Sequence, residues 1–103
     1  MATHAVQPIE KIDIDANAHL LLGFLGVAIA NFSQKAAAKK LRDIIFMTYN
    51  DRLMDLAREM VNFLVRIGRV DQGMSEAVGD DLFNQFKAIR DERTRREHHI
   101  GIE

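Results

Sequence analysis

The stretch from Ala18 to Phe32, AHLLLGFLGVAIANF, constrains the fold of this chain more than any other feature. Its central eleven residues, Leu20–Ala30, carry no polar side chain. A helix that crosses a membrane needs about 20 such residues, so this run is too short to span one. It is also too apolar for the outer helix of a small protein, which normally keeps one polar face in water. We therefore predict a helix that is buried on nearly every side.

The composition favours a single all-α domain. The chain has 103 residues, which is enough for one hydrophobic core. Few glycines, one proline and few aromatic residues suit packed helices and argue against a sandwich or barrel. There is no cysteine, which excludes a disulfide framework and a thiolate nucleophile. Acidic residues precede the apolar run, unlike in a secretory signal, so we expect a cytoplasmic protein with no membrane partner.

The first third of the chain predicts an arm followed by a helix. The arm covers residues 1–14 and has an apolar end, Ile9–Ile14. Asp15 is the expected N-cap, because its carboxylate can accept hydrogen bonds from the free amides of a first turn. The helix itself is expected over about residues 16–31.

The next segment predicts one long helix over about residues 34–67. Apolar residues recur every four positions from Ala37 through Tyr49 to Val61, with no glycine or proline between them. A break near Asn50 is the alternative, because its side chain could cap a new helix.

Gly68 is the expected stop of the long helix. A third helix follows over about residues 75–97, beginning at Ser75, or at Asp80 if Gly79 breaks the first turn. From Arg90 to His99 no residue is apolar, and we expect residues 90–103 to form a charged helical extension with a frayed C-terminus. Together the three helices predict a helical bundle.

Four residues of the first helix share one narrow stripe of its surface at about 100° per residue: His19, Gly23, Gly26 and Ala30. We predict this stripe as a site of close helix packing or an oligomer interface. Because the helix has no polar face, two other helices of the same chain would not cover it. We therefore expect a homo-oligomer, most simply a dimer. The alternative is a compact monomer in which Ile9–Ile14 folds back over this helix.

No catalytic, metal-binding or cofactor-binding motif is present. No Glu is followed three residues later by His, as the di-metal carboxylate pattern of helical proteins requires. The two serines, Ser33 and Ser75, stand at expected helix starts, where capping explains them. No glycine-rich phosphate loop or nucleophile elbow occurs. We therefore predict no catalytic residue, no metal, no cofactor and no enzymatic activity.

The function that we favour is that of a small adaptor or regulatory protein that binds an unidentified protein partner. The candidate contacts are large apolar residues off the main row of the long helix, together with the arginines of the charged extension: Phe46, Met47, Phe63, Arg90, Arg93, Arg95 and Arg96.

A small dimeric nucleic-acid-binding regulator is the alternative. The segment Ser33–Arg42 carries four positive charges and no negative one, from Lys35, Lys39, Lys40 and Arg42. Three of them share a helix face, which suits contacts with phosphates. We rank this function second, because the net charge of the whole chain is −1.

Overall fold

The computed structural model of the chain describes residues 11–102, and the side chains of residues 11–97. Its α-helices are α1 (Ala18–Phe24), α2 (Gln34–Met47), α3 (Asn50–Arg66) and α4 (Ser75–Ile102), and a short 3₁₀ helix, η1 (Gln72–Met74), precedes α4. No strand occurs among these described residues, so the predicted all-α class is confirmed.

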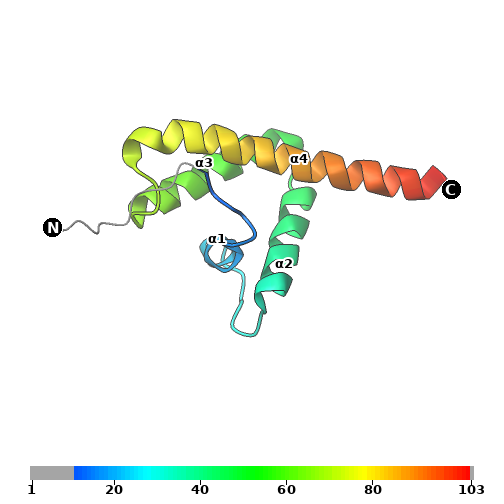
Figure 1. Cartoon of the computed structure of the whole chain (residues 1–103), viewed down its shortest axis with the longest axis horizontal. Helices are drawn as coiled ribbons and strands as arrows, with labels where there is room; N and C mark the ends of the chain where they lie inside the picture. Colours follow the sequence, from blue (N-terminus) through cyan, green and yellow to red (C-terminus); the bar gives the residue numbers. More distant parts are fainter. Residues whose placement is uncertain (1–10, 103) are drawn as a thin grey trace.

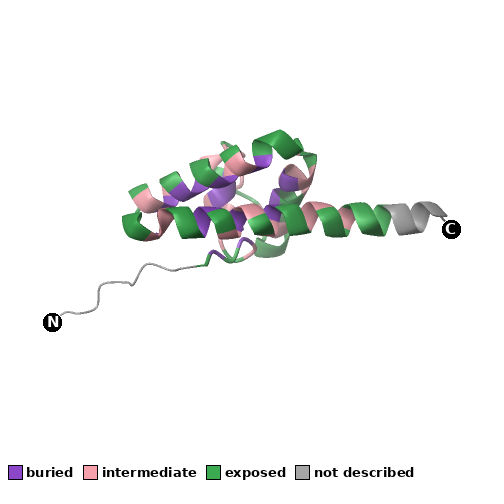
Figure 2. Cartoon of the chain, turned by 90° about the horizontal axis from the view of Figure 1, so that it is seen from above, coloured by how far each residue is buried: buried purple, intermediate pink, exposed green. Residues whose placement is uncertain are grey.

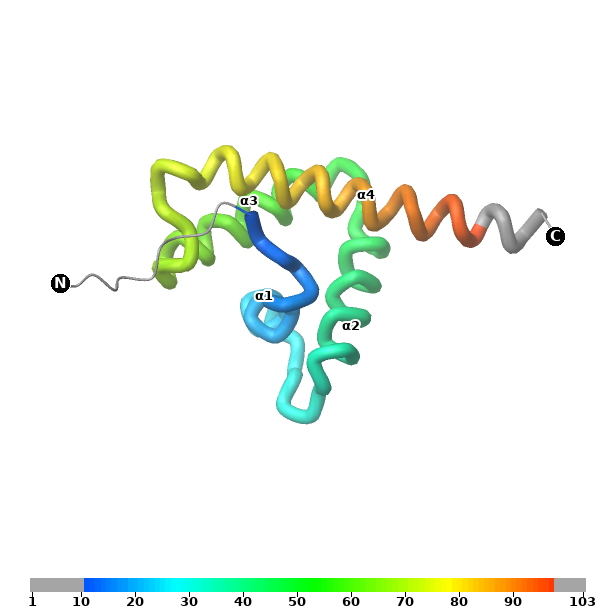
Figure 3. Tube along the Cα trace, viewed as in Figure 1, coloured from blue at the N-terminus to red at the C-terminus, as the bar shows by residue number. Residues whose placement is uncertain are grey.

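The pair formed by α3 and α4 organises the molecule. These helices lie along each other, α2 runs across the pair, and α1 lies between α2 and α3 (Figures 1 and 3). The C-terminal part of α4 continues beyond α2. Within residues 11–102, no helix combines the length and the apolar character needed to span a membrane.

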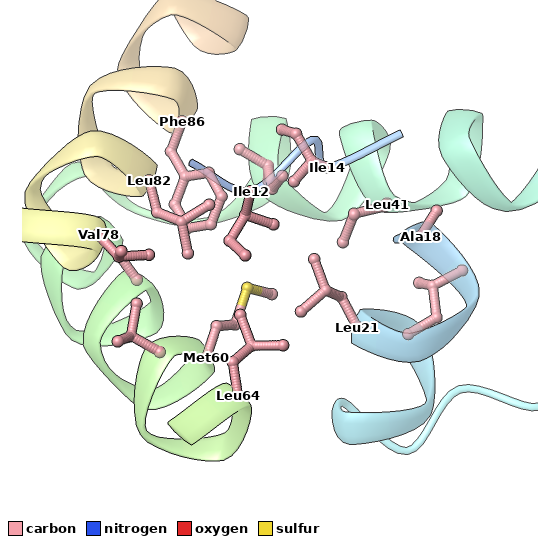
Figure 4. Packing of buried hydrophobic residues seen from close by; sticks show 14 of the residues in the cluster. Ile12, Ile14, Ala18, Leu21, Leu41, Met60, Leu64, Val78, Leu82 and Phe86 are labelled. Atoms are coloured by element: carbon pink, nitrogen blue, oxygen red, sulfur yellow. The ribbon is translucent and has the colours of Figure 1, made fainter. Parts of the chain in front are cut away.

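One hydrophobic core joins all four α-helices (Figure 4). Each long helix contributes an apolar row at spacings of three or four residues, which places its members on one face. The N-terminal segment and α1 fill the space between these rows. The buried hydrophobic residues are Ile12, Ile14, Ala18, Leu21, Leu22, Ala37, Leu41, Ile45, Leu53, Ala57, Met60, Val61, Leu64, Val70, Val78, Leu82 and Phe86.

The prediction of one unbroken helix over residues 34–67 is wrong, and the alternative break near Asn50 is confirmed. The chain turns at Thr48 and Tyr49, whose ψ angles of 134° and 148° are extended rather than helical. The Thr48 hydroxyl donates to the carbonyl of Ile44 at 2.8 Å, which satisfies one of the free acceptors at the end of α2. Tyr49 continues the apolar row in the sequence, but it is 78% exposed because the row is interrupted there.

The first helix was predicted too long. It ends at Phe24, because Gly26 adopts a left-handed conformation with φ of +81°. The amide of Gly26 donates to the carbonyl of Gly23, and the amide of Val27 donates to that of Leu22, both at 3.0 Å. This pair of bonds is a Schellman motif, a common helix end.

The predicted stripe is therefore not a helix stripe. His19 and Gly23 belong to α1, whereas Gly26 and Ala30 lie in the loop after it.

A Schellman motif also ends α3, where Gly68 has φ of +80°. The helix stop predicted at Gly68 is therefore confirmed.

The N-terminal arm enters the core. Ile12 and Ile14 are 2% and 4% exposed, and the side-chain amide of Gln85 donates to the carbonyl of Ile12 at 3.0 Å. The residues before Lys11 lie outside the described part of the chain. Within that part, Ile12 and Ile14 join the core that the four α-helices share, and the choice between dimer and monomer stays a prediction.

Asp15 is not an N-cap, so that prediction is wrong. Asp13 accepts hydrogen bonds from the backbone amides of Asp15 and Ala16 instead, at 3.0 and 3.1 Å. The N-cap position of α1 is Asn17, which makes no capping bond with its side chain. The carboxylate of Asp15 is directed to Arg42 of α2.

The last helix, α4, begins at Ser75 as predicted. Its 28 residues give it a length of about 42 Å. One face of its first half is buried against α3, while exposed residues dominate from Asp91 to Glu97 (Figure 2). Gly79 is buried at this contact, where an added Cβ would lie 3.9 Å from a methyl group of Val61. The helix continues to Ile102, so the expected frayed end is helical in the part that the structure describes.

Candidate functional site

The turn between α2 and α3 carries the most exposed large apolar residues of the described chain. Met47 is 76% exposed and Tyr49 is 78% exposed. They border a shallow groove of about 390 Å³, whose lining also includes Leu56. Charged side chains complete the rim of this surface, which we call the α2–α3 corner: Arg52, Asp55 and Glu59.

The two phenylalanines predicted as partner contacts are engaged inside the chain. The ring of Phe46 lies 4.4 Å from the guanidinium of Arg93 and 6.0 Å from that of Arg90. Phe63 stacks on Phe24 of α1, with ring centroids 4.8 Å apart. Both phenylalanines are half-buried. Among the three apolar candidates, only Met47 projects into solvent.

A second groove, of about 530 Å³, lies between α2 and the C-terminal half of α4. We call it the α2–α4 groove. Five of its side chains are positive, three are negative and Ile89 is its apolar member. The residues that line it are Lys35, Lys39, Arg42, Asp43, Ile89, Glu92, Arg93, Arg96 and Glu97.

Ion pairs hold part of this groove together. Arg93 donates to Asp43 across the two helices at 2.6 Å and also lies 3.6 Å from Glu97. The Arg93 hydrogen bond holds the pKa of Asp43 below its ordinary value. Arg90 donates to the carbonyl of Thr48, where a cation is favoured by the helix dipole of α2. The first turns of the predicted charged extension are therefore attached to α2.

Arg42 also has a structural role. Its guanidinium donates two hydrogen bonds to the Asp15 carboxylate, both of 2.9 Å, and these bonds raise its pKa above the ordinary value. A planar guanidinium and a carboxylate match in this two-bond geometry. The contact fixes the N-terminal segment to α2.

The remaining basic candidates are more open. Lys39 pairs with Asp43 at 3.4 Å but its side chain is 79% exposed, and Arg96 pairs with Glu92 at 2.9 Å on the surface of α4. Within the described residues, Lys35, Lys40 and Arg95 are exposed and make no ion pair.

The apolar stretch after His19 is only partly covered. His19 hydrogen-bonds through Nε2 to the carbonyl of Phe32 at 3.0 Å, which closes the loop that follows α1. Apart from Leu21 and Leu22, which are fully buried, the large apolar residues of this stretch are half-buried. We call the surface that they form the α1 loop surface; it comprises Leu20, Phe24, Leu25, Val27, Ile29 and Phe32.

Sequence reasoning missed the exposure of Tyr49, because the four-residue repeat assigned this residue to a buried row. The neighbouring sequence Tyr49-Asn50-Asp51 contained the signal for the break. It also missed the meeting of Lys35 and Lys39 with arginines from α4, because no local pattern links residues more than fifty positions apart.

No group of three or more His, Asp or Glu side chains that could hold a metal lies in the described part of the chain. Comparison with known proteins gave no match to a family model, to a curated protein or to a solved structure.

Proposed function

We propose that the protein is a small non-enzymatic helical adaptor or regulatory protein that binds another protein through the α2–α3 corner. The observation that carries this proposal is the exposure of Met47 and Tyr49, which are 76% and 78% accessible while the core residues of the long helices are fully buried. Its location in the cytoplasm stays a prediction from the sequence.

The composition of the corner supports this function. Protein interfaces are enriched in methionine and tyrosine at their centre and have a polar rim. Here Met47, Tyr49 and Leu56 form the centre, and charged residues surround them. A flexible methionine next to a rigid tyrosine suits the apolar face of a partner helix.

The α1 loop surface supports self-association as the second part of the proposal. Its large apolar residues pack on the core on one side and remain partly open on the other. Burial of such a surface against a second copy would remove apolar area from water. We therefore propose a homodimer formed through the α1 loop surface. This proposed interface replaces the helix stripe of His19, Gly23, Gly26 and Ala30 that the sequence predicted.

The corner is tested with the variant Met47→Ser/Tyr49→Ser. A photo-crosslinking residue is placed at position 56, and crosslinked proteins from the native host are identified. We expect at least one partner whose purified form binds the wild-type chain and binds the double variant about tenfold or more weakly, which corresponds to about 1.4 kcal/mol.

Ile67→Ser is the matched control. Ile67 is also an exposed apolar residue, at 45%, but it lies at the other end of α3, about 25 Å along the helix. A partner whose binding is unaffected by the double variant, or is weakened equally by Ile67→Ser, contradicts the assignment of the corner.

The homodimer is tested by light scattering on the wild type and on Val27→Ser/Ile29→Ser, which leaves the stack of Phe24 on Phe63 intact. A dimer that becomes a folded monomer in the variant is expected. A wild-type chain that stays monomeric at high protein concentration contradicts this part of the proposal and leaves the corner unaffected.

A further inference from the structure

We propose that the α2–α4 groove is a second binding site, and that it takes the phosphate backbone of double-stranded nucleic acid without reading its sequence. The juxtaposition that carries this proposal is the meeting of Lys35 and Lys39 of α2 with Arg96 of α4 around one groove. This site is separate from the α2–α3 corner, so it goes beyond the proposed adaptor function.

The fold separates the charges of the chain. Residues 34–47 and 90–97 contain eight positive and four negative side chains, whereas the whole chain has a net charge of −1. The rest of the chain therefore has a formal charge of −5. Because α2 and the second half of α4 meet at the groove, the small net charge of the protein hides a positive region, which is where a polyanion would be attracted.

The cations of the groove divide into two sets. Arg42 and Arg93 are fixed by hydrogen bonds to Asp15 and Asp43, so they position the helices. The other three cations have more exposed side chains. Two of them form weak ion pairs on the surface, and the third forms no ion pair within the described residues, so all three can turn toward a phosphate at little cost. This second set is Lys35, Lys39 and Arg96.

The N-terminal end of α2 adds to the attraction for anions. The first turn of α2 contains Lys35 and no acidic residue, whereas those of α3 and α4 contain Asp51 and Glu76. The helix dipole makes this end positive, so Lys35 stands where a cation is disfavoured. A phosphate in the groove would be attracted by both charges.

The groove contains no aromatic residue among those that line it. Proteins that prefer single strands stack bases on aromatic side chains, and this groove has no surface for that contact. Contacts with phosphates position a protein on a duplex but carry no sequence information. The chemistry of the groove therefore favours a duplex over a single strand.

The test measures fluorescence polarisation of a labelled DNA duplex with the full chain over a range of salt concentrations. Three phosphate contacts predict an affinity that falls about 40-fold between about 50 and about 200 mM salt. The variant Lys35→Gln/Lys39→Gln/Arg96→Gln should bind at least about tenfold more weakly at low salt and lose most of the salt dependence.

Arg58→Gln/Arg66→Gln/Arg69→Gln is the matched control, because it removes the same charge from exposed arginines that do not line the groove. It should change the affinity by less than about threefold. Circular dichroism establishes that both variants are folded.

Four outcomes would overturn the proposal. They are no binding of the duplex by the wild type at low salt, equal weakening by the two triple variants, tighter binding of a single strand of the same length, and competition by poly-glutamate as effective as that by the duplex. The last outcome would assign the groove to an acidic polypeptide.

Discussion

Replacing each of three glycines with alanine should have opposite effects on stability, depending on the backbone conformation. Gly26 and Gly68 have φ of +81° and +80°, whereas Gly23 is helical. A Cβ at any of the three would meet no atom within 4 Å, so packing contributes nothing to the difference. Only the conformational preference of the backbone remains.

The magnitudes follow from that preference. An alanine in the left-handed region costs about 1–2 kcal/mol, of which the reduced entropy of the unfolded chain offsets about 0.4–1 kcal/mol. Gly26→Ala and Gly68→Ala should therefore each lower the free energy of unfolding by about 1 kcal/mol. Gly23→Ala should gain about 0.5–1 kcal/mol, because glycine is unfavourable within a helix.

Urea denaturation followed by far-UV circular dichroism measures these differences, and unchanged m values would show that the unfolded state is comparable. In thermal melts, Gly26→Ala should lower the melting temperature by about 5 °C, and Gly23→Ala should raise it by a few degrees. Gly68→Ala serves as the internal reference. If Gly26→Ala stabilises the protein as Gly23→Ala does, the first helix continues past Phe24 and the structural reasoning is refuted.

Two further predictions concern the core and the ion pair between α2 and α4. Phe86 is fully buried, so Phe86→Ala should lose about 3–5 kcal/mol in urea denaturation, whereas truncation of the half-buried Phe83 should cost clearly less; equal losses would contradict the described core. The hydrogen bond from Arg93 lowers the pKa of Asp43 below 3.8, so the pair stabilises the fold above that pH and is lost as the pH falls through the lowered pKa. Asp43→Asn should therefore lower the melting temperature near neutral pH. It should also reduce the further fall in melting temperature that the wild type shows below about pH 4. A dependence of the melting temperature on pH equal to that of the wild type would contradict the role of the pair.

The outcome at the two helix stops shows what the sequence can reveal about this fold. At Gly68 the prediction was right, because a charged segment follows and the apolar row ends there. At Gly26 the same motif was missed, since the residues after it are as apolar as those before it. Hydrophobicity does not distinguish a buried helix from a buried loop, so only the pair of bonds made by the amides of Gly26 and Val27 identifies the end.

The candidate sites were predictable only in part. The positive charge of α2 and the apolar character of Met47 were evident from the sequence, but the exposure of each depends on tertiary contacts. Arg93 shows why: its partners, Asp43 and the ring of Phe46, lie about fifty residues earlier. A contact of this range depends on the angle between two helices, which no local spacing specifies.

The hydrogen bond from Gln85 to the carbonyl of Ile12 has a consequence for the order of folding. It joins residues 73 positions apart, and closing a loop of that length costs about 4 kcal/mol of chain entropy. The contacts of α3 with α4 close much shorter loops, so this pair can form first and offer the N-terminal segment a preformed surface. On this basis we expect Ile12 and Ile14 to dock only after α4 has been synthesised, whereas α1 can already pack on α2, the helix that it mainly contacts.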